Sequence, residues 1–204
     1  MDEDKNKILN YAHQKFMKGG FYKVSMDELA SDLGMSKKTI YKYFPSKERL
    51  VEEVSIRLRE NVRSKIEDII ESDKDAVIKI VGLLKTVGEV LAKVEERMMA
   101  DLQKHLPLLW IEIDEFRTKQ INQFFTKIVN QGKKEGFIVN FPIEIIMTVY
   151  LSSIRAVINP TFVMNNKFTF KEAMDYTFNI ILNGILTDKG RKIFNKSVIG
   201  LNYE

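Results

Sequence analysis

The chain has 204 residues, no cysteine and a formal net charge of +4 at pH 7. The lack of cysteine excludes disulfides, thiolate metal sites and cysteine nucleophiles, and the length allows one or two domains. We expect a cytoplasmic protein with no membrane association. The first residues are charged, and no uncharged apolar run approaches the ~18 residues that a membrane span needs.

The positive charge is concentrated in the first third of the chain. Residues 1–65 carry 14 Lys and Arg against 10 Asp and Glu, and the remaining residues carry 18 of each. The segment 36–50 contains one acidic residue and five basic ones, namely Lys37, Lys38, Lys42, Lys47 and Arg49. A basic patch on a nearly neutral chain indicates either a polyanionic partner at one end or an ordinary solvated face.

Two helices are predicted in the first 34 residues. Apolar residues four positions apart, such as Ile8, Ala12 and Phe16, predict a helix over about 4–18 that Gly19-Gly20 ends. The sequence Ser25-Met26-Asp27-Glu28 is a capping box that opens the next helix. Gly34 is suited to the left-handed residue that ends it.

A third, short helix is expected between its cap Ser36 and Pro45. Because the turn before it has only about three residues, the two helices must cross steeply, as in a helix-turn-helix. At ~100° per residue, Ile40 and Phe44 fall together and point to the core. The residues of the opposite face and its flanks, which could meet base edges and phosphates, are Lys38, Thr39, Tyr41, Lys42 and Tyr43.

The rest of the chain also shows helical periodicity, so the predicted fold is all-α with about nine to ten helices. A fourth helix over about 46–71 links the helix-turn-helix unit, 1–50, to the remainder, 51–204. Further helices are expected over about 74–91, 95–105, 107–133, 142–159, 169–186 and 191–195. Pro107, Pro142 and the capping box Thr169-Phe170-Lys171-Glu172 mark three of these starts.

Residues from about Lys7 to Val54 resemble the DNA-binding domain of the tetracycline-repressor (TetR) family of bacterial regulators. The resemblance spans roughly a quarter of the chain and combines many positions in register. It rests on Phe16, Gly20-Phe21, Ser25-Met26-Asp27-Glu28-Leu29-Ala30, Leu33-Gly34-Met35-Ser36, Thr39-Ile40-Tyr41-Lys42-Tyr43-Phe44 and Lys47-Glu48-Arg49-Leu50.

The resemblance implies a dimeric, ligand-responsive repressor that binds an inverted-repeat operator in double-stranded DNA and is released by a small molecule. It implies that Tyr43 and Lys47 contact phosphates and that Ser25 anchors the second helix near the DNA backbone. The expected DNA-binding residues are Ser25, Ser36, Lys37, Lys38, Thr39, Tyr41, Lys42, Tyr43 and Lys47.

The part after residue 51 shows no motif, and it is where the resemblance places effector binding and dimerisation. Met and aromatic residues suit an adaptable site for an apolar or amphipathic effector, although for each residue taken singly a place in the core is the stronger interpretation. The candidate pocket residues are Met98, Met99, Trp110, Phe116, Phe124 and Tyr150. The candidate dimer residues, on two late helices, are Val149, Ser153, Val157, Thr177, Ile180, Ile181 and Gly184.

Two other classes of function compete with this interpretation. An enzyme is disfavoured, because only Asp101 and His105 pair at metal-ligand spacing, without a third ligand, and no nucleophile or phosphate-loop motif occurs. We therefore predict no catalytic residue, no metal and no cofactor. A helix-turn-helix adaptor that binds a protein is the second alternative, and the salt dependence of DNA binding distinguishes it.

Overall fold

The computed structural model describes residues 3–198, apart from the side chains of Glu96 and Val198. This range forms eleven helices and no strand beyond an isolated bridge between Ile138 and Leu186, so the predicted all-α class is confirmed. The helices are α1 (Glu3–Gly19), α2 (Met26–Leu33), α3 (Lys37–Tyr43), α4 (Lys47–Glu71), α5 (Ala76–Leu91), α6 (Glu96–His105), α7 (Pro107–Glu135), α8 (Ile143–Val157), α9 (Pro160–Asn166), α10 (Phe170–Ile185) and α11 (Asp188–Val198).

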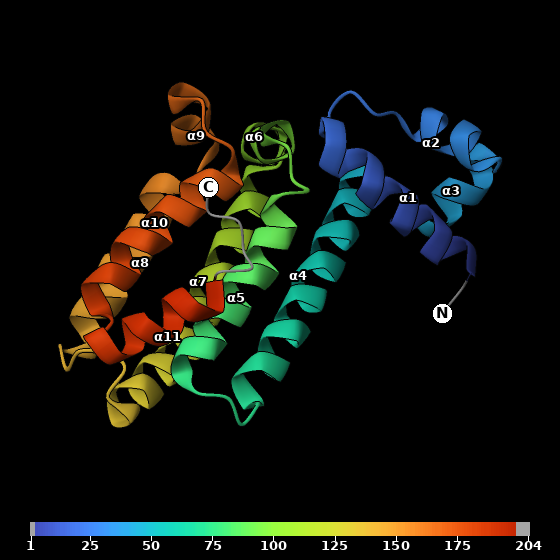
Figure 1. Cartoon of the computed structure of the whole chain (residues 1–204). Coiled ribbons are helices and arrows are strands. Elements are labelled where there is room, and N and C mark those ends of the chain that lie inside the picture. The colour runs from blue at the N-terminus through green and yellow to red at the C-terminus, as the bar shows by residue number, and fades with distance from the viewer. Residues whose placement is uncertain (1–2, 199–204) are drawn as a thin grey trace.

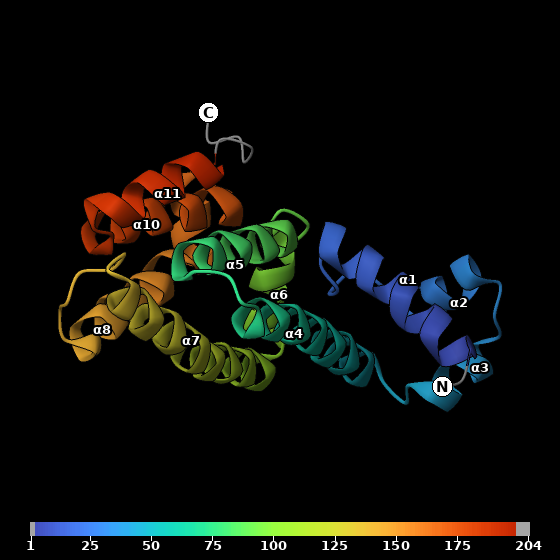
Figure 2. The ribbon, with the colours of Figure 1, turned by 60° about the horizontal axis from the view of Figure 1, so that its bottom comes forward.

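The helices gather into two groups that α4 connects. Helices α1, α2 and α3 form the smaller group, and α5 with α7, α8, α10 and α11 forms the larger one (Figure 1). Turning the molecule shows α4 running from the small group into the large one, with α6 lying near the end of α1 (Figure 2). Helix α3 is therefore carried at one end of the molecule, away from the larger group.

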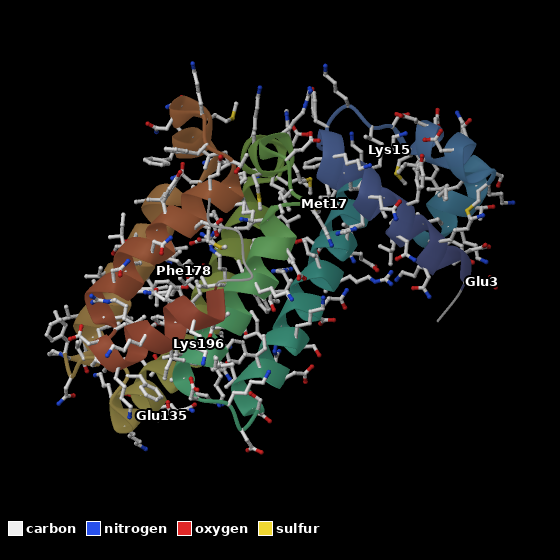
Figure 3. The ribbon with its side chains drawn as sticks, viewed as in Figure 1. Glu3, Lys15, Met17, Glu135, Phe178 and Lys196 are labelled. Carbon is white, nitrogen blue, oxygen red and sulfur yellow. The ribbon has the colours of Figure 1, made fainter. Side chains whose placement is uncertain are left out.

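Each group has its own hydrophobic core. The larger core includes Phe125, Phe178 and Leu182. The smaller one is built on Phe16 and Leu50, and it is completed by four residues from beyond the first four helices, namely Val94, Met98, Leu102 and Leu109. Met17 also belongs to this core, and Figure 3 shows it at the end of α1 that approaches the C-terminal helices. The group formed by α1, α2 and α3 thus rests on α6 through shared apolar contacts.

Three helices start at the capping residues that the sequence predicts. The hydroxyls of Ser36 and Ser46 accept the amides of Thr39 and Arg49 at 3.0 and 3.2 Å, which satisfies amide donors that a helix start leaves unpaired. Thr169 and Glu172 form the complete reciprocal capping box of α10. These caps depend only on residues three apart, which is why sequence alone locates them.

Helix α9 is absent from the sequence-based prediction, which read Asn159-Pro160 only as the end of the preceding helix. In the structure Asn159 accepts the amide of Phe162 at 2.9 Å, and Pro160 occupies the first turn of the new helix. Asparagine before proline is a start signal as well as a stop signal. The last helix is also longer than expected, because α11 begins at Asp188 and not near residue 191.

Among the described residues, no single helix is long and apolar enough to cross a membrane. Helices α8 and α9 have the length and apolar composition of a membrane span only when they are counted as one segment, and the chain bends by 63° between them.

Candidate nucleic-acid interface

The turn between α2 and α3 has the geometry that the sequence predicts. Gly34 adopts φ 65°, and its amide and that of Met35 donate to carbonyl oxygens of the last turn of α2. A left-handed residue without a Cβ costs little here. Ser36 is extended and caps α3 at once, so α3 begins after a turn of only three residues.

The predicted inward face of α3 is confirmed. Ile40 and Phe44 are fully buried in the smaller core. The ammonium of Lys5 lies 5.6 Å from the centre of the Phe44 ring. Burial of two large apolar side chains contributes about 1.5–3 kcal/mol each, which is enough to hold a seven-residue helix that would not persist alone.

The opposite face of α3 is open to solvent. Lys38 and Lys42 are exposed, and Tyr41 is 46% exposed. Thr39 is half-buried, with its hydroxyl 2.8 Å from that of Ser36. The Lys42 ammonium lies 5.1 Å from the centre of the half-buried Tyr43 ring. A short basic helix with a rigid apolar back is a form that enters the major groove of DNA.

Two of the expected DNA-binding lysines already have protein partners. Lys37 forms an ion pair with Asp27 of α2 at 2.5 Å, and both side chains are more than half exposed. An exposed pair of this kind contributes only about 0–1 kcal/mol, so a phosphate can replace Asp27. Lys47 donates to the carbonyl oxygens of Tyr22 and Val24 at 2.8 and 3.0 Å.

The position of Lys47 gives it a structural contact that sequence reasoning did not find. An ammonium group has three donors, and two of them tie the first residue of α4 to the loop between α1 and α2. The hydroxyl of Ser25, another expected DNA-binding residue, accepts a hydrogen bond from the amide of Glu28 at 3.0 Å and so caps α2.

Helices α1 and α2 are joined by a polar cluster that the sequence pattern does not reveal. Lys15 lies 2.5 Å from Asp32 and 2.6 Å from Glu28, and the hydroxyl of Tyr11 donates to Asp32 at 2.7 Å. The hydrogen bond from Lys15 is the main reason that the pKa values of both carboxyls are lowered, and the bond to Asp32 raises the pKa of Lys15.

The loop 20–25 is attached to α6 as well as to α4. The Asp101 carboxylate is 9% exposed and accepts the amide of Tyr22 at 2.9 Å. The ring of Tyr22 stacks on His105, with centroids 3.8 Å apart and planes at 8°. The two residues considered as a metal pair thus hold the loop, and among residues 3–198 no cluster of three or more potential metal ligands occurs.

The six candidate effector residues are divided between the two cores. Met98 belongs to the smaller core and Trp110 packs against it, whereas Phe124 and Tyr150 are buried in the larger core. Burial raises the pKa of Tyr150. Met99 touches both cores. The half-buried Phe116 ring has the guanidinium of Arg59 5.2 Å from its centre.

The candidate dimer residues include both exposed and buried side chains. Val149 is 53% and Ile180 75% exposed, and Gly184 is exposed. The half-buried Ser153 donates to the Val149 carbonyl at 2.7 Å, and Val157 is half-buried too. Two further candidates, Thr177 and Ile181, are buried within the chain. The exposed members lie on α8 and α10.

Comparison with known proteins agrees with this geometry. Residues 8–54 match the model of the family described as bacterial regulatory proteins, tetR family. The uncharacterized HTH-type transcriptional regulator YvaF of Bacillus subtilis is 26% identical over 169 residues, which is 82% of this chain and 88% of that protein. The HTH-type transcriptional regulator LmrA of the same organism is 31% identical over 42% of this chain and 46% of its own length.

Solved structures share the fold over most of the chain. A TetR transcription regulator from Haloarcula marismortui superposes with a TM-score of 0.73 at 15% identity, covering 92% of this chain and all of that one. The relatives named here are all described as transcriptional regulators. Residues 8–54 are thus the helix-turn-helix DNA-binding domain of the tetR family of bacterial regulatory proteins, and over 92% of its length the chain has the fold of a solved TetR transcription regulator.

Proposed function

We propose that the protein is a dimeric repressor that binds an inverted-repeat operator in the cytoplasm and leaves it when a small molecule binds. The observation that carries sequence-specific binding is the division of α3. Lys38, Tyr41 and Lys42 are exposed on one side, while Ile40 and Phe44 are fully buried on the other. The exposed side chains can therefore reach base edges without any loss of packing.

An unpaired apolar surface on α8 and α10 supports the homodimer. Ile145, Val149, Tyr176 and Ile180 are each more than half exposed, and large exposed apolar patches commonly mark interfaces. A two-fold axis through this surface would place one α3 on each side of the molecule. Two such helices read half-sites about one DNA turn, ~34 Å, apart, which is why the proposed operator is an inverted repeat.

Ligand release requires two states of the dimer with different affinities for DNA. The proposed effector is apolar or amphipathic and binds to the part of the chain after residue 51. It favours the state in which the distance between the two α3 helices does not match the two half-sites of the operator. Only this difference in affinity can shift the population. Helix α4 connects the two groups of helices (Figure 1), so a small displacement in the larger group is carried to Lys47 beside α3.

Selection of binding sites from a random duplex pool at near-physiological salt tests the proposal. We expect an enriched inverted repeat whose affinity falls steeply with salt, because lysine–phosphate contacts release counterions. Lys38→Ala and Lys42→Ala should each reduce the preference for the selected base over other bases. The expected reduction is about 1–3 kcal/mol for each base-specific hydrogen-bonded pair that the substitution removes. Lys85→Ala is the matched control, because Lys85 is exposed on α5.

A folded, dimeric protein that enriches no sequence and shows a flat salt dependence would contradict the repressor. That result would favour an adaptor whose helix-turn-helix binds a protein. Lys47→Ala should weaken binding to every sequence equally. It removes a phosphate contact and also frees the loop that Lys47 holds through Tyr22 and Val24.

A further inference from the structure

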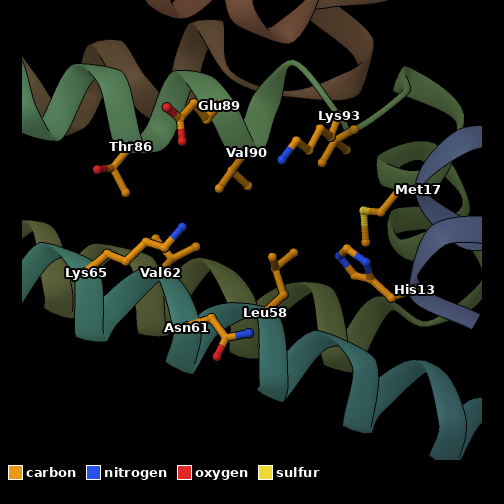
Figure 4. Close-up of a pocket in the computed structure, with 11 residues that line it drawn as sticks. His13, Met17, Leu58, Asn61, Val62, Lys65, Thr86, Glu89, Val90 and Lys93 are labelled. Atoms are coloured by element: carbon orange, nitrogen blue, oxygen red, sulfur yellow. The ribbon is translucent and has the colours of Figure 1, made fainter. Parts of the chain in front are cut away.

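A hollow of about 240 Å³ lies where the DNA-binding end meets the larger group of helices. Figure 4 shows its walls: His13 and Met17 of α1 close one end, Leu58 and Val62 of α4 form one side, and Val90 of α5 faces them. A more open hollow adjoins it and shares His13, Met17 and Lys93. Neither hollow contains any of the six residues considered above for the effector.

The inner wall of the hollow is apolar. Met17 is buried, Leu58, Val62 and Val90 are half-buried, and all four are aliphatic or thioether side chains. Water in contact with such a wall gains few hydrogen bonds, so an apolar group that replaces it is favoured. Because a liquid-sized water occupies about 30 Å³, the hollow has room for roughly eight groups of methylene size.

The rim is mainly cationic. Lys65 and Lys93 are exposed at its edge, against the single acid Glu89. Among the described residues, neither lysine has a side-chain hydrogen bond or ion pair. His13 projects from the α1 wall, and its pKa is lowered, first by burial and then by the positive charges of Arg57 and Lys93. The potential at this rim is therefore positive.

We propose that this hollow binds a small amphipathic anion, with an apolar body of about six to eight carbons and one carboxylate or sulfonate between Lys65 and Lys93. The apolar body would contact Val62 and Val90, and the anion would stay at the wet rim. This is the arrangement that avoids burying a charge without a partner. The inference names an effector class and a location, and it rests on the ligand response proposed above.

The position of the hollow connects ligand binding to DNA binding. One wall belongs to α1, which carries the core of the DNA-binding end, and the other walls belong to α4 and α5. An occupied hollow holds α1 and α5 at one separation, whereas the empty one lets them approach. The same coupling acts in both directions, so operator DNA must lower the affinity for the anion by the factor by which the anion lowers affinity for the operator.

The test uses the full chain and octanoate as the probe, with 1-octanol, octylammonium and inorganic phosphate as matched controls. The protein has only two histidines, so the ring signals of His13 and His105 can be assigned by NMR with the variant His105→Gln. We expect octanoate to shift the His13 signals and raise the His13 pKa. Octanol, octylammonium and phosphate should each bind at least about fivefold more weakly than octanoate. This factor corresponds to the Coulomb energy of one screened charge pair at contact distance.

Variants of the rim and the wall locate the site. Lys65→Gln and Lys93→Gln should each weaken octanoate binding about fivefold for the same reason. Lys85→Gln should leave it unchanged, because Lys85 does not line the hollow. Val90→Trp fills the hollow and should abolish binding, and the lysine variants give the answer if Val90→Trp does not fold.

The proposal is overturned if octanoate does not bind, if it binds without moving the His13 signals, or if the lysine variants bind it as well as wild type does. It is also overturned if bound octanoate leaves the operator Kd unchanged. All of these outcomes leave operator binding without ligand intact. Failure of the repressor itself would appear separately, as no enriched operator in the absence of any probe.

Discussion

Gly20 lies at the point where the loop after α1 is held by α6, and a methyl group there should be costly. Gly20 has φ +76°, and an added Cβ would lie 2.3 Å from Oδ2 of Asp101. The left-handed backbone costs a non-glycine residue about 1–2 kcal/mol. The clash also forces the carboxylate away from the Tyr22 amide, and loss of that charge-assisted bond costs about 1.5–3 kcal/mol. Gly20→Ala should therefore destabilise by about 2.5–5 kcal/mol.

A double-mutant cycle separates these two costs. In an Asp101→Ala background the clash with the carboxylate is absent, and only the flexible Arg97 side chain lies close, with Cγ 3.1 Å from the added Cβ. Gly20→Ala should then cost mainly the backbone contribution of about 1–2 kcal/mol. Urea unfolding at one protein concentration, with unchanged m values, measures all four proteins. Gly19→Ala is the control, because nothing lies within 4 Å of its Cβ position. If the destabilisation of the double mutant equals the sum of the two single-mutant values to within about 0.5 kcal/mol, the contact between Gly20 and Asp101 is refuted.

Three further outcomes are expected. Phe44→Ala should lower the free energy of unfolding by about 3–5 kcal/mol, because Phe44 is fully buried beneath α3; a decrease below about 1 kcal/mol in urea unfolding would mean that α3 is not anchored there. Because the pKa of Asp32 is lowered in the folded state, its stabilising contribution exists above its unfolded pKa and disappears as pH falls through the folded one. Lys15→Met should reduce the fall in Tm on acidification, and an unchanged Tm profile would contradict this. Ile180→Asp should shift the protein from dimer to monomer in sedimentation, while Thr161→Asp, an exposed control on α9, should not.

The features that the sequence predicted well are local ones. The caps at Ser36 and Ser46 and the buried pair Ile40 and Phe44 involve residues three or four apart. A helix brings such residues together whatever surrounds it. The all-α class and the exposure of the lysines of α3 were predicted from the same helical periodicity, and the structure confirms both. The extra helix at Pro160 was missed because asparagine and proline both end and begin helices.

Contacts between distant segments could not be predicted in the same way. The acceptor of the Tyr22 amide lies 79 residues away at Asp101. Lys47, which the resemblance implied to be a phosphate contact, donates hydrogen bonds to carbonyls 25 and 23 residues earlier. The spacing of Asp101 and His105 suggested a metal pair because the sequence shows that the two residues share a helix face. It does not show that this face packs against the loop at Tyr22.

The amino-acid sequence by itself determined that this chain is helical, where its helix-turn-helix begins and ends, and which side of α3 faces outward. Turn chemistry and side-chain periodicity act within one or two helical turns, so they are already present in the chain. The tertiary structure alone decided that α6 supports the DNA-binding end and that His13, Leu58 and Val90 surround one hollow. Those arrangements depend on how α1, α4 and α5 cross, and crossing angles are set by packing between whole helix surfaces.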